Sequence, residues 1–390
     1  MNSDAVIIGW AHSHFGKSEA PDVEALMAET GGAALVHAGI DPQDVDFASV
    51  GVFNNGFSRQ GLEAGLISVA VPGLEHTPAQ RSENACATGT AALYSAADFI
   101  ASGRGRIALV VGAEKMTASS NAEIGDILLS ASYRKEEADV SGGFAGIFAQ
   151  IAQSYFQKNG DRSAEMAMIA AKNHANGVHN PYAHLQRDFG FSFCNTVSDK
   201  NPLVAAPLRR TDCSLVSDGA AALVLADRET AQDMARAIGF RARASRNDIF
   251  PLSRRDITAF DGARKAWDAA KSLAGIDLKD LDFVETHDCF TIAEMIEYEA
   301  MGLTARGEGW KAAREGWTRK DGILPVNPSG GLKSKGHPIG ATGVSMHVMA
   351  AMQLMGEAGG MQIADAEMGA VFNMGGAAVS NYVSVLERIH

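Results

Sequence analysis

Two stretches of the sequence nearly repeat each other: AGIDPQDVDFASVGV at Ala38–Val52 and AGIDLKDLDFVETHD at Ala274–Asp288. A second repeat pairs CATG at Cys86–Gly89 with GATG at Gly340–Gly343, and each of these is followed by an apolar helical pattern and a strand that ends in glycine. Similarity over so long a period indicates a duplicated domain and not an array of short units. Because each copy alternates helical and strand patterns, the sequence predicts a mixed α/β fold.

The duplication divides the chain into two predicted halves, residues 1–237 and 238–390. In the first half, residues 116–211 interrupt the repeat with polar loops and the aromatic cluster FGFSF at Phe189–Phe193. Long insertions often form functional lids, so we expect residues 116–211 to cover the functional site and the aromatic cluster to shape its pocket.

The composition is that of an ordinary globular protein, with 46% hydrophobic and 21% charged residues. The formal net charge is −12 and no long basic run occurs, which argues against nucleic acid as a partner. No apolar run approaches the roughly 20 residues of a membrane-spanning helix, and the N-terminus lacks the basic region of a signal peptide. We therefore expect a cytoplasmic protein without membrane contact. The cysteines lack paired spacing, which predicts reduced thiols and no metal site; they are Cys86, Cys194, Cys213 and Cys289.

The segment ENACATGTAA at Glu83–Ala92 places Cys86 at the start of a predicted helix, with Asn84 as its N-cap. The helix dipole and the unpaired backbone N–H groups at such a position favour the thiolate, which is the nucleophilic form of cysteine. A buried structural cysteine is the alternative that this segment alone leaves open.

Three further segments could complete a site around Cys86: THDCF at Thr286–Phe290, NPSGGLKSKGHPIGATG at Asn327–Gly343 and NMGGAA at Asn373–Ala378. Acyl transfer through a cysteine needs a base beside the thiol, an oxyanion hole, and an acid/base for the second substrate. These segments contain histidines, a further cysteine and glycine-rich turns, which are the residue types that such chemistry uses.

His337 suits the base, because imidazole titrates near neutral pH and can take and return a thiol proton. The repeat places Cys86 and His337 near the starts of equivalent helices, whose ends can meet if the halves pack about a pseudo-twofold axis. Gly375 and Gly376 would leave backbone N–H groups open to an oxyanion. The structural alternative is that these are only turn residues. The histidines of the insertion are interpreted as surface or loop residues: His174, His179 and His184.

Together these segments resemble the thiolases, and within them the branch associated with sterol carrier protein. ENACATG resembles the nucleophile motif of that family, GHPIGATG its histidine motif, and SDGAAALVLA the strand after the loop excursion. HDCF resembles the signature of the sterol carrier branch. The resemblance implies the thiolase fold, in which duplicated βαβαβαββ halves form a layered α-β-α-β-α core and a loop domain is inserted in the first half.

The resemblance also implies an acyltransferase of lipid and fatty acid metabolism. Such an enzyme carries out reversible thiolysis of a 3-oxoacyl-CoA, or Claisen condensation of two acyl-CoA molecules, through an acyl-cysteine. Cys86 would be acylated and His337 would activate it. One oxyanion hole would consist of the backbone N–H groups of Cys86 and Gly375, and the other of His287 with His337. Coenzyme A would be a substrate, with no permanently bound cofactor.

One position departs from the family pattern. Many thiolases use a second cysteine, in a CxG motif after the last core strand, as the acid/base, whereas this chain has Asn373 there. Asparagine cannot transfer the proton, so Cys289 of HDCF is assigned as the acid/base instead. The departure leaves alternatives open: an acyl-CoA hydrolase, a protein like the steroid side-chain aldolases, or a scaffold that binds acyl-CoA or lipid.

Because coenzyme A carries phosphates, an acidic protein must gather positive charge locally to bind it. The candidate contacts for coenzyme A are Arg209, Arg210, Ser253, Arg254, Arg255, Phe290, Lys333 and Lys335. The resemblance further implies a homodimer or a tetramer that forms through the edge of the first-half sheet. It also allows a small OB-fold partner subunit.

Overall fold

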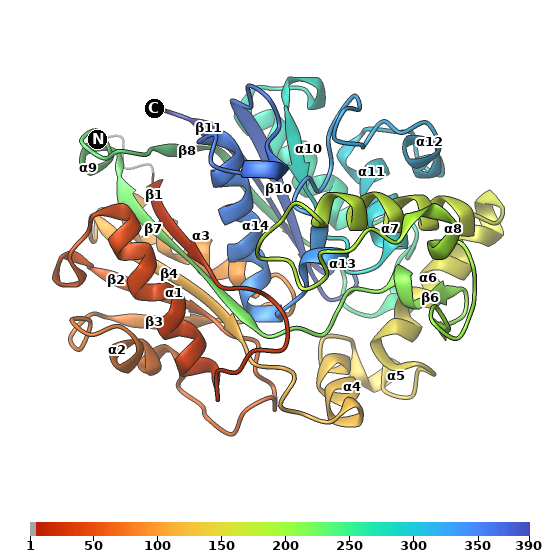
Figure 1. Ribbon diagram of the computed structural model, residues 1–390, viewed down its shortest axis with the longest axis horizontal. Coiled ribbons are helices and arrows are strands. Elements are labelled where there is room, and N and C mark those ends of the chain that lie inside the picture. The colour runs from red at the N-terminus through yellow and green to blue at the C-terminus, as the bar shows by residue number, and fades with distance from the viewer. Residues whose placement is uncertain (1–4) are drawn as a thin grey trace.

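The computed structural model describes residues 5–390, and a large mixed sheet runs through the centre of the molecule (Figure 1). The strands of this sheet are β1 (Ala5–His12), β2 (Phe47–Gly51), β3 (Ala79–Ser82), β4 (Ile107–Glu114), β7 (Gly219–Asp227), β8 (Ile238–Asn247), β9 (Phe283–Glu285), β10 (Met368–Gly375) and β11 (Ser380–Arg388). A separate two-stranded sheet pairs β5 (Leu203–Ala205) with β6 (Leu208–Arg209). The predicted α/β class is confirmed.

The large sheet has the strand order β3-β2-β4-β7-β1-β8-β11-β10-β9, which is symmetric about its centre apart from the edge strand β3. β1 and β8 meet there as an antiparallel pair, in which Val6 lies opposite Gly239. On either side of this pair, β7 with β4 and β11 with β10 are antiparallel, whereas β4 with β2 and β10 with β9 are parallel. The arrangement therefore occurs twice, in agreement with the repeat in the sequence. The division into residues 1–237 and 238–390 stays a prediction.

The AGID repeat has the same local structure in both copies. Helix α1 (Val23–Ala38) ends at Gly39 with φ 72°, and helix α10 (Asp261–Ala274) ends at Gly275 with φ 65°. Glycine suits both positions because a left-handed residue at a helix end strains any side chain with a Cβ. A short 3-10 turn follows each helix and leads into β2 or β9. The repeat thus encodes one helix–turn–strand unit twice.

Helices lie outside and between the two groups of strands. Helix α1 packs on one face of β1, β4 and β7, and α10 packs on β8 and β11. Two central helices, α3 (Thr88–Ala101) and α14 (Ile339–Leu354), pack against each other, and α14 also contacts β4, β7 and β10. Successive residues of β7 face opposite sides, so Val224 packs in the core with α1 and Leu223 in the core with α3 and α14. This is the layered α-β-α-β-α order that the resemblance implies.

The two central helices approach closely because the CATG and GATG repeats place glycine where they cross. A Cβ at Gly89 would lie 2.7 Å from the backbone nitrogen of Val344, and one at Gly343 would lie 2.3 Å from that of Thr90. Real Cβ atoms essentially never come so close to a backbone atom. The crossing lies within the first two turns of both helices, so the residues just before them, including Cys86, are brought together.

The insertion forms a separate group of helices, on the right and at the bottom of Figure 1. Its helices are α4 (Asn121–Leu129), α5 (Arg134–Glu137), α6 (Gly143–Asn159), α7 (Ser163–Gly177) and α8 (Gly190–Cys194). The other helices are α2 (Ile67–Ala70), α9 (Arg228–Ala231), α11 (Thr291–Met301), α12 (Gly309–Arg314) and α13 (Gly331–Lys335). Short 3-10 turns lie at Pro42–Asp44, Glu63–Leu66, Arg210–Asp212, Leu252–Arg254, Leu278–Asp280 and Gly359–Met361. Among residues 5–390, no helix has the length and apolar character needed to cross a bilayer.

Candidate active site

Cys86 lies in a tight turn that leads into α3. Ala85 has φ 49°, a left-handed conformation that is unusual for a residue with a side chain. Helix α3 has Ala87 at its N-cap, so the prediction that Asn84 caps the helix is wrong. The Asn84 side chain instead donates a hydrogen bond from Nδ2 to Tyr382 Oη at 2.6 Å. This bond anchors the turn to β11, in the other half of the molecule.

The thiol of Cys86 is buried, and burial raises its pKa to about 12. A backbone hydrogen bond from Gly376 opposes this shift, whereas the carboxylates of Glu83 and Glu114 add to it. The stabilisation of a thiolate by the helix terminus is therefore smaller than the free energy that burying the thiolate costs. The resting residue is a neutral thiol, and the thiolate expected from the sequence is not the resting form.

Cys86, His287 and His337 come together from three segments that are far apart in the chain. The Cys86 sulfur and one ring nitrogen from each histidine all lie within 4.8 Å of one another. The two imidazole rings are nearly perpendicular, at an angle of 79°, with centroids 5.2 Å apart. All three residues are buried. The expectation that the repeat brings Cys86 and His337 together is confirmed.

The hydrogen bonds of His337 define which nitrogen carries its proton. Nδ1 lies 2.7 Å from Thr342 Oγ1, and the Thr342 hydroxyl donates to the Pro338 carbonyl at 2.8 Å. Because the hydroxyl hydrogen is already used, Thr342 accepts from Nδ1–H, and Nε2 keeps its lone pair. Burial, with a smaller effect from the Lys335 ammonium, lowers the pKa of His337 to about 3. A neutral imidazole therefore presents an acceptor nitrogen beside the thiol.

His287 is completely buried, and its Nδ1 lies 2.9 Å from Asn373 Nδ2. Burial lowers the pKa of His287 well below its ordinary value, and the neighbouring His337 and Lys335 lower it further. Among residues 5–390, Nε2 of His287 and Nε2 of His337 both lack a hydrogen-bond partner. Two unpaired nitrogens thus lie beside one thiol.

The adjacent Asp288 holds the HDCF segment against the loop that carries His337. Its carboxylate accepts hydrogen bonds from the backbone N–H groups of Leu332 at 2.6 Å and of Lys333 at 3.1 Å, in the first turn of α13. Asn173 of the insertion donates to the same carboxylate at 2.7 Å. Asp288 therefore ties together three segments that sequence reasoning could not connect.

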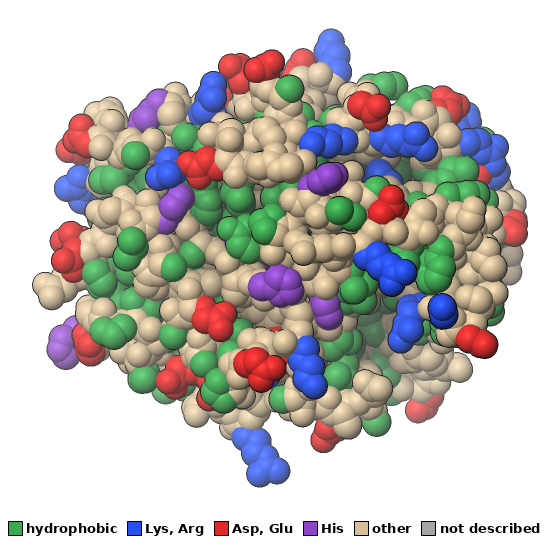
Figure 2. All heavy atoms as spheres, in the orientation of Figure 1, with side chains coloured by type: hydrophobic (Ala, Val, Ile, Leu, Met, Phe, Trp, Pro, Cys, Tyr) green, Lys and Arg blue, Asp and Glu red, His purple; other side chains and the backbone are tan. Residues whose placement is uncertain are grey.

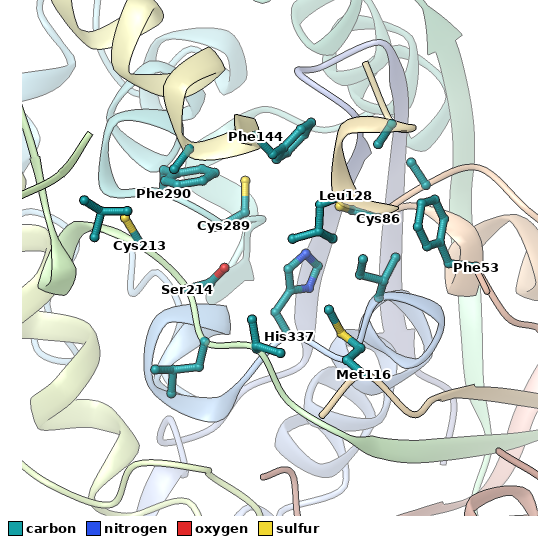
Figure 3. A pocket seen from close by; sticks show the side chains of 17 residues that line it. Phe53, Cys86, Met116, Leu128, Phe144, Cys213, Ser214, Cys289, Phe290 and His337 are labelled. Atoms are coloured by element: carbon teal, nitrogen blue, oxygen red, sulfur yellow. The ribbon is translucent and has the colours of Figure 1, made fainter. Parts of the chain in front are cut away.

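An apolar cavity opens beside this cluster and contacts Cys86, Cys289 and His337 (Figure 3). Met116, Leu128 and Phe144 are among the insertion residues that line it. The expectation that the insertion contributes to the wall of the site is therefore confirmed. Burial raises the pKa of the Cys289 thiol well above its ordinary value, and the nearby Cys86 sulfur adds to this effect. Cys289 is thus a neutral thiol that faces the same cavity.

A second cavity lies between the insertion and helix α13, and it shares Leu215 with the first. Its lining includes the stacked rings of Phe189 and Phe193, whose centroids are 4.8 Å apart. The aromatic cluster therefore shapes this second cavity and not the one beside Cys86, contrary to the sequence-based expectation. His174 also lines it and is completely buried, so its interpretation as a surface or loop residue is wrong.

The second cavity is rich in positive charge. Arg187, Lys200, Arg210 and Lys333 line it, and the first three are exposed and form no ion pair with any residue of 5–390. Figure 2 shows Lys and Arg side chains beside hydrophobic ones over the part of the insertion that contains α8 and β6. Arg187 also places its guanidinium 5.0 Å from the centre of the Phe189 ring.

The other candidate contacts for coenzyme A lie in different surroundings. Phe290 lines the first cavity and stacks on Phe148 at 4.3 Å. Arg209 is buried and pairs with Asp212 at 2.7 Å. The remaining candidates line neither cavity: the exposed Ser253 and Arg254, and the more buried Arg255 and Lys335.

Sequence reasoning missed Glu114, a buried carboxylate at the end of β4. It accepts hydrogen bonds from the backbone N–H groups of Phe53 at 2.9 Å, Asn54 at 3.1 Å and Gly340 at 2.9 Å. It thereby fixes one wall of the cavity and the start of α14. Burial raises the pKa of Glu114 to about 7. A single acidic residue after the apolar run IALVVGA was the signal that could have found it.

Comparisons with known proteins agree with this geometry. Residues 5–190 match the thiolase N-terminal domain model, and residues 245–388 match the thiolase C-terminal domain-like model. An acetyl-CoA acetyltransferase of Methanothermobacter thermautotrophicus is 35% identical over 390 residues, which cover 99% of this chain and 100% of that protein. Human sterol carrier protein 2 is 32% identical over 376 residues, which cover 92% of this chain and 67% of that protein.

Solved structures show the same fold at low identity. An aldolase structure named Ltp2-ChsH2(DUF35) has a TM-score of 0.84 at 20% identity, covering 99% of this chain and 98% of that chain. A monomeric SCP2-thiolase-like protein of Mycobacterium smegmatis has a TM-score of 0.78 at 17% identity, covering 99% of this chain and 78% of that chain. The two family models, the full-length relative and the shared fold lead to one conclusion: this chain belongs to the thiolase family.

Proposed function

We propose that the protein is an acyl-CoA C-acyltransferase that cleaves a 3-oxoacyl-CoA with coenzyme A or, in reverse, condenses two acyl-CoA molecules. The observation that carries this proposal is the cluster of Cys86, His287 and His337 beside an apolar cavity. A buried thiol, an acceptor nitrogen and a second histidine are the groups that acyl transfer through a cysteine needs. The similarity to acetyl-CoA acetyltransferases supports the same reaction.

In the first step, Cys86 gives its proton to Nε2 of His337, and its sulfur attacks the 3-oxo carbon of the substrate. The backbone N–H groups of Cys86 and Gly375 stabilise the oxyanion that forms. When this intermediate collapses, the bond between carbons 2 and 3 breaks and its electron pair goes to carbon 2. The products of this step are an acyl-Cys86 and the enolate of the shortened acyl-CoA.

Cys289 then protonates carbon 2 of the enolate. Its raised pKa suits this role, because the residue carries its proton at neutral pH. His287 and the protonated His337 donate hydrogen bonds to the enolate oxygen until the proton arrives. In the second half of the reaction the coenzyme A thiol gives its proton to Cys289, and its sulfur attacks the acyl group. Cys86 leaves and recovers its proton from His337.

We propose that the nucleotide end of coenzyme A binds in the second cavity. Arg187, Lys200 and Arg210 supply charge for its phosphates, and the stacked rings of Phe189 and Phe193 offer an apolar face to a purine. From there the pantetheine arm would pass Leu215, which lines both cavities, and reach Cys86. Arg209 is not part of this phosphate-binding set, because its guanidinium is already paired with Asp212.

We further propose that the chain acts in cytoplasmic lipid metabolism and forms a homodimer or a tetramer. Strand β3 supports assembly, because among the described residues it pairs only with β2 and leaves one sheet edge open. The similarity to the Ltp2-ChsH2(DUF35) aldolase supports a small partner subunit as well. Light scattering of the purified chain measures its oligomeric state. Light scattering after co-expression with the neighbouring genes shows whether a small subunit binds.

The function is tested by thiolysis of acetoacetyl-CoA, measured as the loss of the 3-oxo thioester on addition of coenzyme A. We expect turnover by the native protein, none by Cys86→Ala, and strongly reduced turnover by Cys289→Ala. If acetoacetyl-CoA and longer 3-oxoacyl-CoA substrates all remain uncleaved by the native protein, the proposal is wrong and the scaffold alternative stands.

A further inference from the structure

We infer that Asn373 is a positioning residue that fixes the proton of His287 on Nε2, where it can be donated to the substrate. The inference rests on the proposed function and assigns a role to the residue found where many thiolases carry a second cysteine. Asn373 is completely buried in β10 and contacts three groups that belong to or border the site. Its Oδ1 lies 2.7 Å from Thr90 Oγ1, and its Nδ2 lies 3.1 Å from the Cys86 carbonyl oxygen and 2.9 Å from His287 Nδ1.

These contacts permit only one orientation of the amide. The Cys86 carbonyl can only accept a hydrogen bond, so the NH₂ group of Asn373 must face it. The hydroxyl of Thr90 then donates to Oδ1. The second hydrogen of the same NH₂ group points at His287 Nδ1, which must therefore accept. A neutral imidazole has one proton, and here it resides on Nε2.

His287 and His337 are thus held in opposite tautomers. Thr342 accepts from Nδ1–H of His337, so that Nε2 of His337 is an acceptor, whereas Asn373 makes Nε2 of His287 a donor. Both Nε2 atoms are free of other partners within the described chain. One histidine can therefore take the thiol proton while the other already presents an N–H to a developing oxyanion. Without Asn373, no other hydrogen-bond partner on Nδ1 from residues 5–390 would select the donating form of His287.

The same hydrogen bond also opposes metal binding. A soft divalent cation such as Zn²⁺ would find three suitable ligand types in Cys86, His287 and His337, whose ligand atoms lie within 4.8 Å of one another. Coordination through Nε2 of His287 requires its proton on Nδ1. That proton would point at the NH₂ group of Asn373. Two hydrogen-bond donors would then face each other, which is unfavourable. Asn373 therefore both prepares an oxyanion donor and disfavours an inhibitory zinc complex.

The decisive variant is Asn373→Asp, which keeps the size of the side chain but replaces the donor with an acceptor. The carboxylate would accept from His287 Nδ1–H and leave a lone pair on Nε2. We expect kcat for thiolysis to fall about 100- to 1,000-fold, the usual effect of losing one oxyanion donor, while the KM for coenzyme A stays within about twofold. We also expect zinc chloride to inhibit the variant at concentrations at least tenfold lower than those that inhibit the native enzyme.

The matched control is Asn381→Asp, which buries a new carboxylate in the adjacent strand β11, away from both histidines. Asn381 is also completely buried, and its Nδ2 donates to backbone carbonyls, including that of Ala378 at 3.0 Å. We expect this control to keep the zinc sensitivity and the KM of the native enzyme. Inhibition by zinc that rises equally in both variants would show an effect of charge alone and would overturn the inference.

A measurement on the native protein needs no turnover, and it does not depend on how Asn373→Asp folds. Nitrogen NMR of the ¹⁵N-histidine-labelled protein, with His287→Asn used for assignment, reports which ring nitrogen of His287 carries the proton. We expect Nε2. A proton on Nδ1 contradicts the inference even if thiolysis proceeds, whereas a proton on Nε2 supports it even if the proposed reaction is not observed. Retention of native kcat by a folded Asn373→Asp variant would equally overturn it.

Discussion

Alkylation of Cys86 as a function of pH tests the protonation state that the structure assigns to its thiol. With a pKa of about 12 in place of the ordinary 9.0, Cys86 carries on the order of a thousandfold less thiolate at pH 8 than an unperturbed cysteine. A more basic thiolate is also more nucleophilic, which recovers a factor of about 20 to 30 for a shift of this size. The net expectation is a reaction about 30- to 50-fold slower than that of a free thiol, before any effect of limited access.

The assay is a time course with iodoacetamide at pH 6 to 10, with glutathione as an internal standard. Mass spectrometry of the peptide that contains Cys86 separates it from the other cysteines. The rate should rise with pH over the whole range, because no pH in it reaches the pKa of about 12. It should show no step near pH 6.5, since His337 has its pKa at about 3 and stays neutral. A fast rate that is constant from pH 6 to 8 would instead reveal a resting thiolate–imidazolium pair and would contradict a neutral Cys86 thiol.

Three further perturbations follow from particular contacts. Arg187→Glu should raise the KM for coenzyme A at least tenfold with little change in kcat, whereas the exposed Arg254→Glu, which lines neither cavity, should leave the KM unchanged in steady-state kinetics. Thr342→Val removes the acceptor from Nδ1–H of His337 and, on the proposed mechanism, should lower kcat about 10- to 100-fold while the KM is preserved. Gly89→Ala should lower the free energy of unfolding by about 1 to 3 kcal/mol or more, because its Cβ would meet a backbone nitrogen at 2.7 Å. Gly32→Ala, with open space around it, should be neutral or stabilise α1 by up to about 1 kcal/mol in the same denaturation assay.

Much of the fold could be predicted because the sequence repeats itself at positions with strict backbone requirements. Gly39 and Gly275 end equivalent helices in a left-handed conformation, so the AGID repeat is visible as a repeat of structure. Gly89 and Gly343 mark the crossing of the two central helices, where no side chain fits. The crossing in turn explains why Cys86 could be placed beside a histidine from the other half.

The parts that could not be predicted depend on burial and on contacts between distant residues. The dipole argument for a Cys86 thiolate was local, whereas its pKa is set mainly by the surrounding core. Asn84 has the right residue type for an N-cap, but its amide binds Tyr382, almost three hundred residues away. Asn373 could be identified only as a missing cysteine, because its partners Thr90 and His287 lie on other elements.

The proposed reaction requires Cys86 to carry the acyl group, and trapping the acyl-enzyme shows whether it does. The native protein is mixed with acetyl-CoA in the absence of free coenzyme A, quenched in acid, and digested for mass spectrometry. We expect one acetyl group on the peptide that contains Cys86, removed again when coenzyme A is added before the quench. Acetylation of Cys289 instead, or undiminished acetylation of a Cys86→Ala variant, would contradict it.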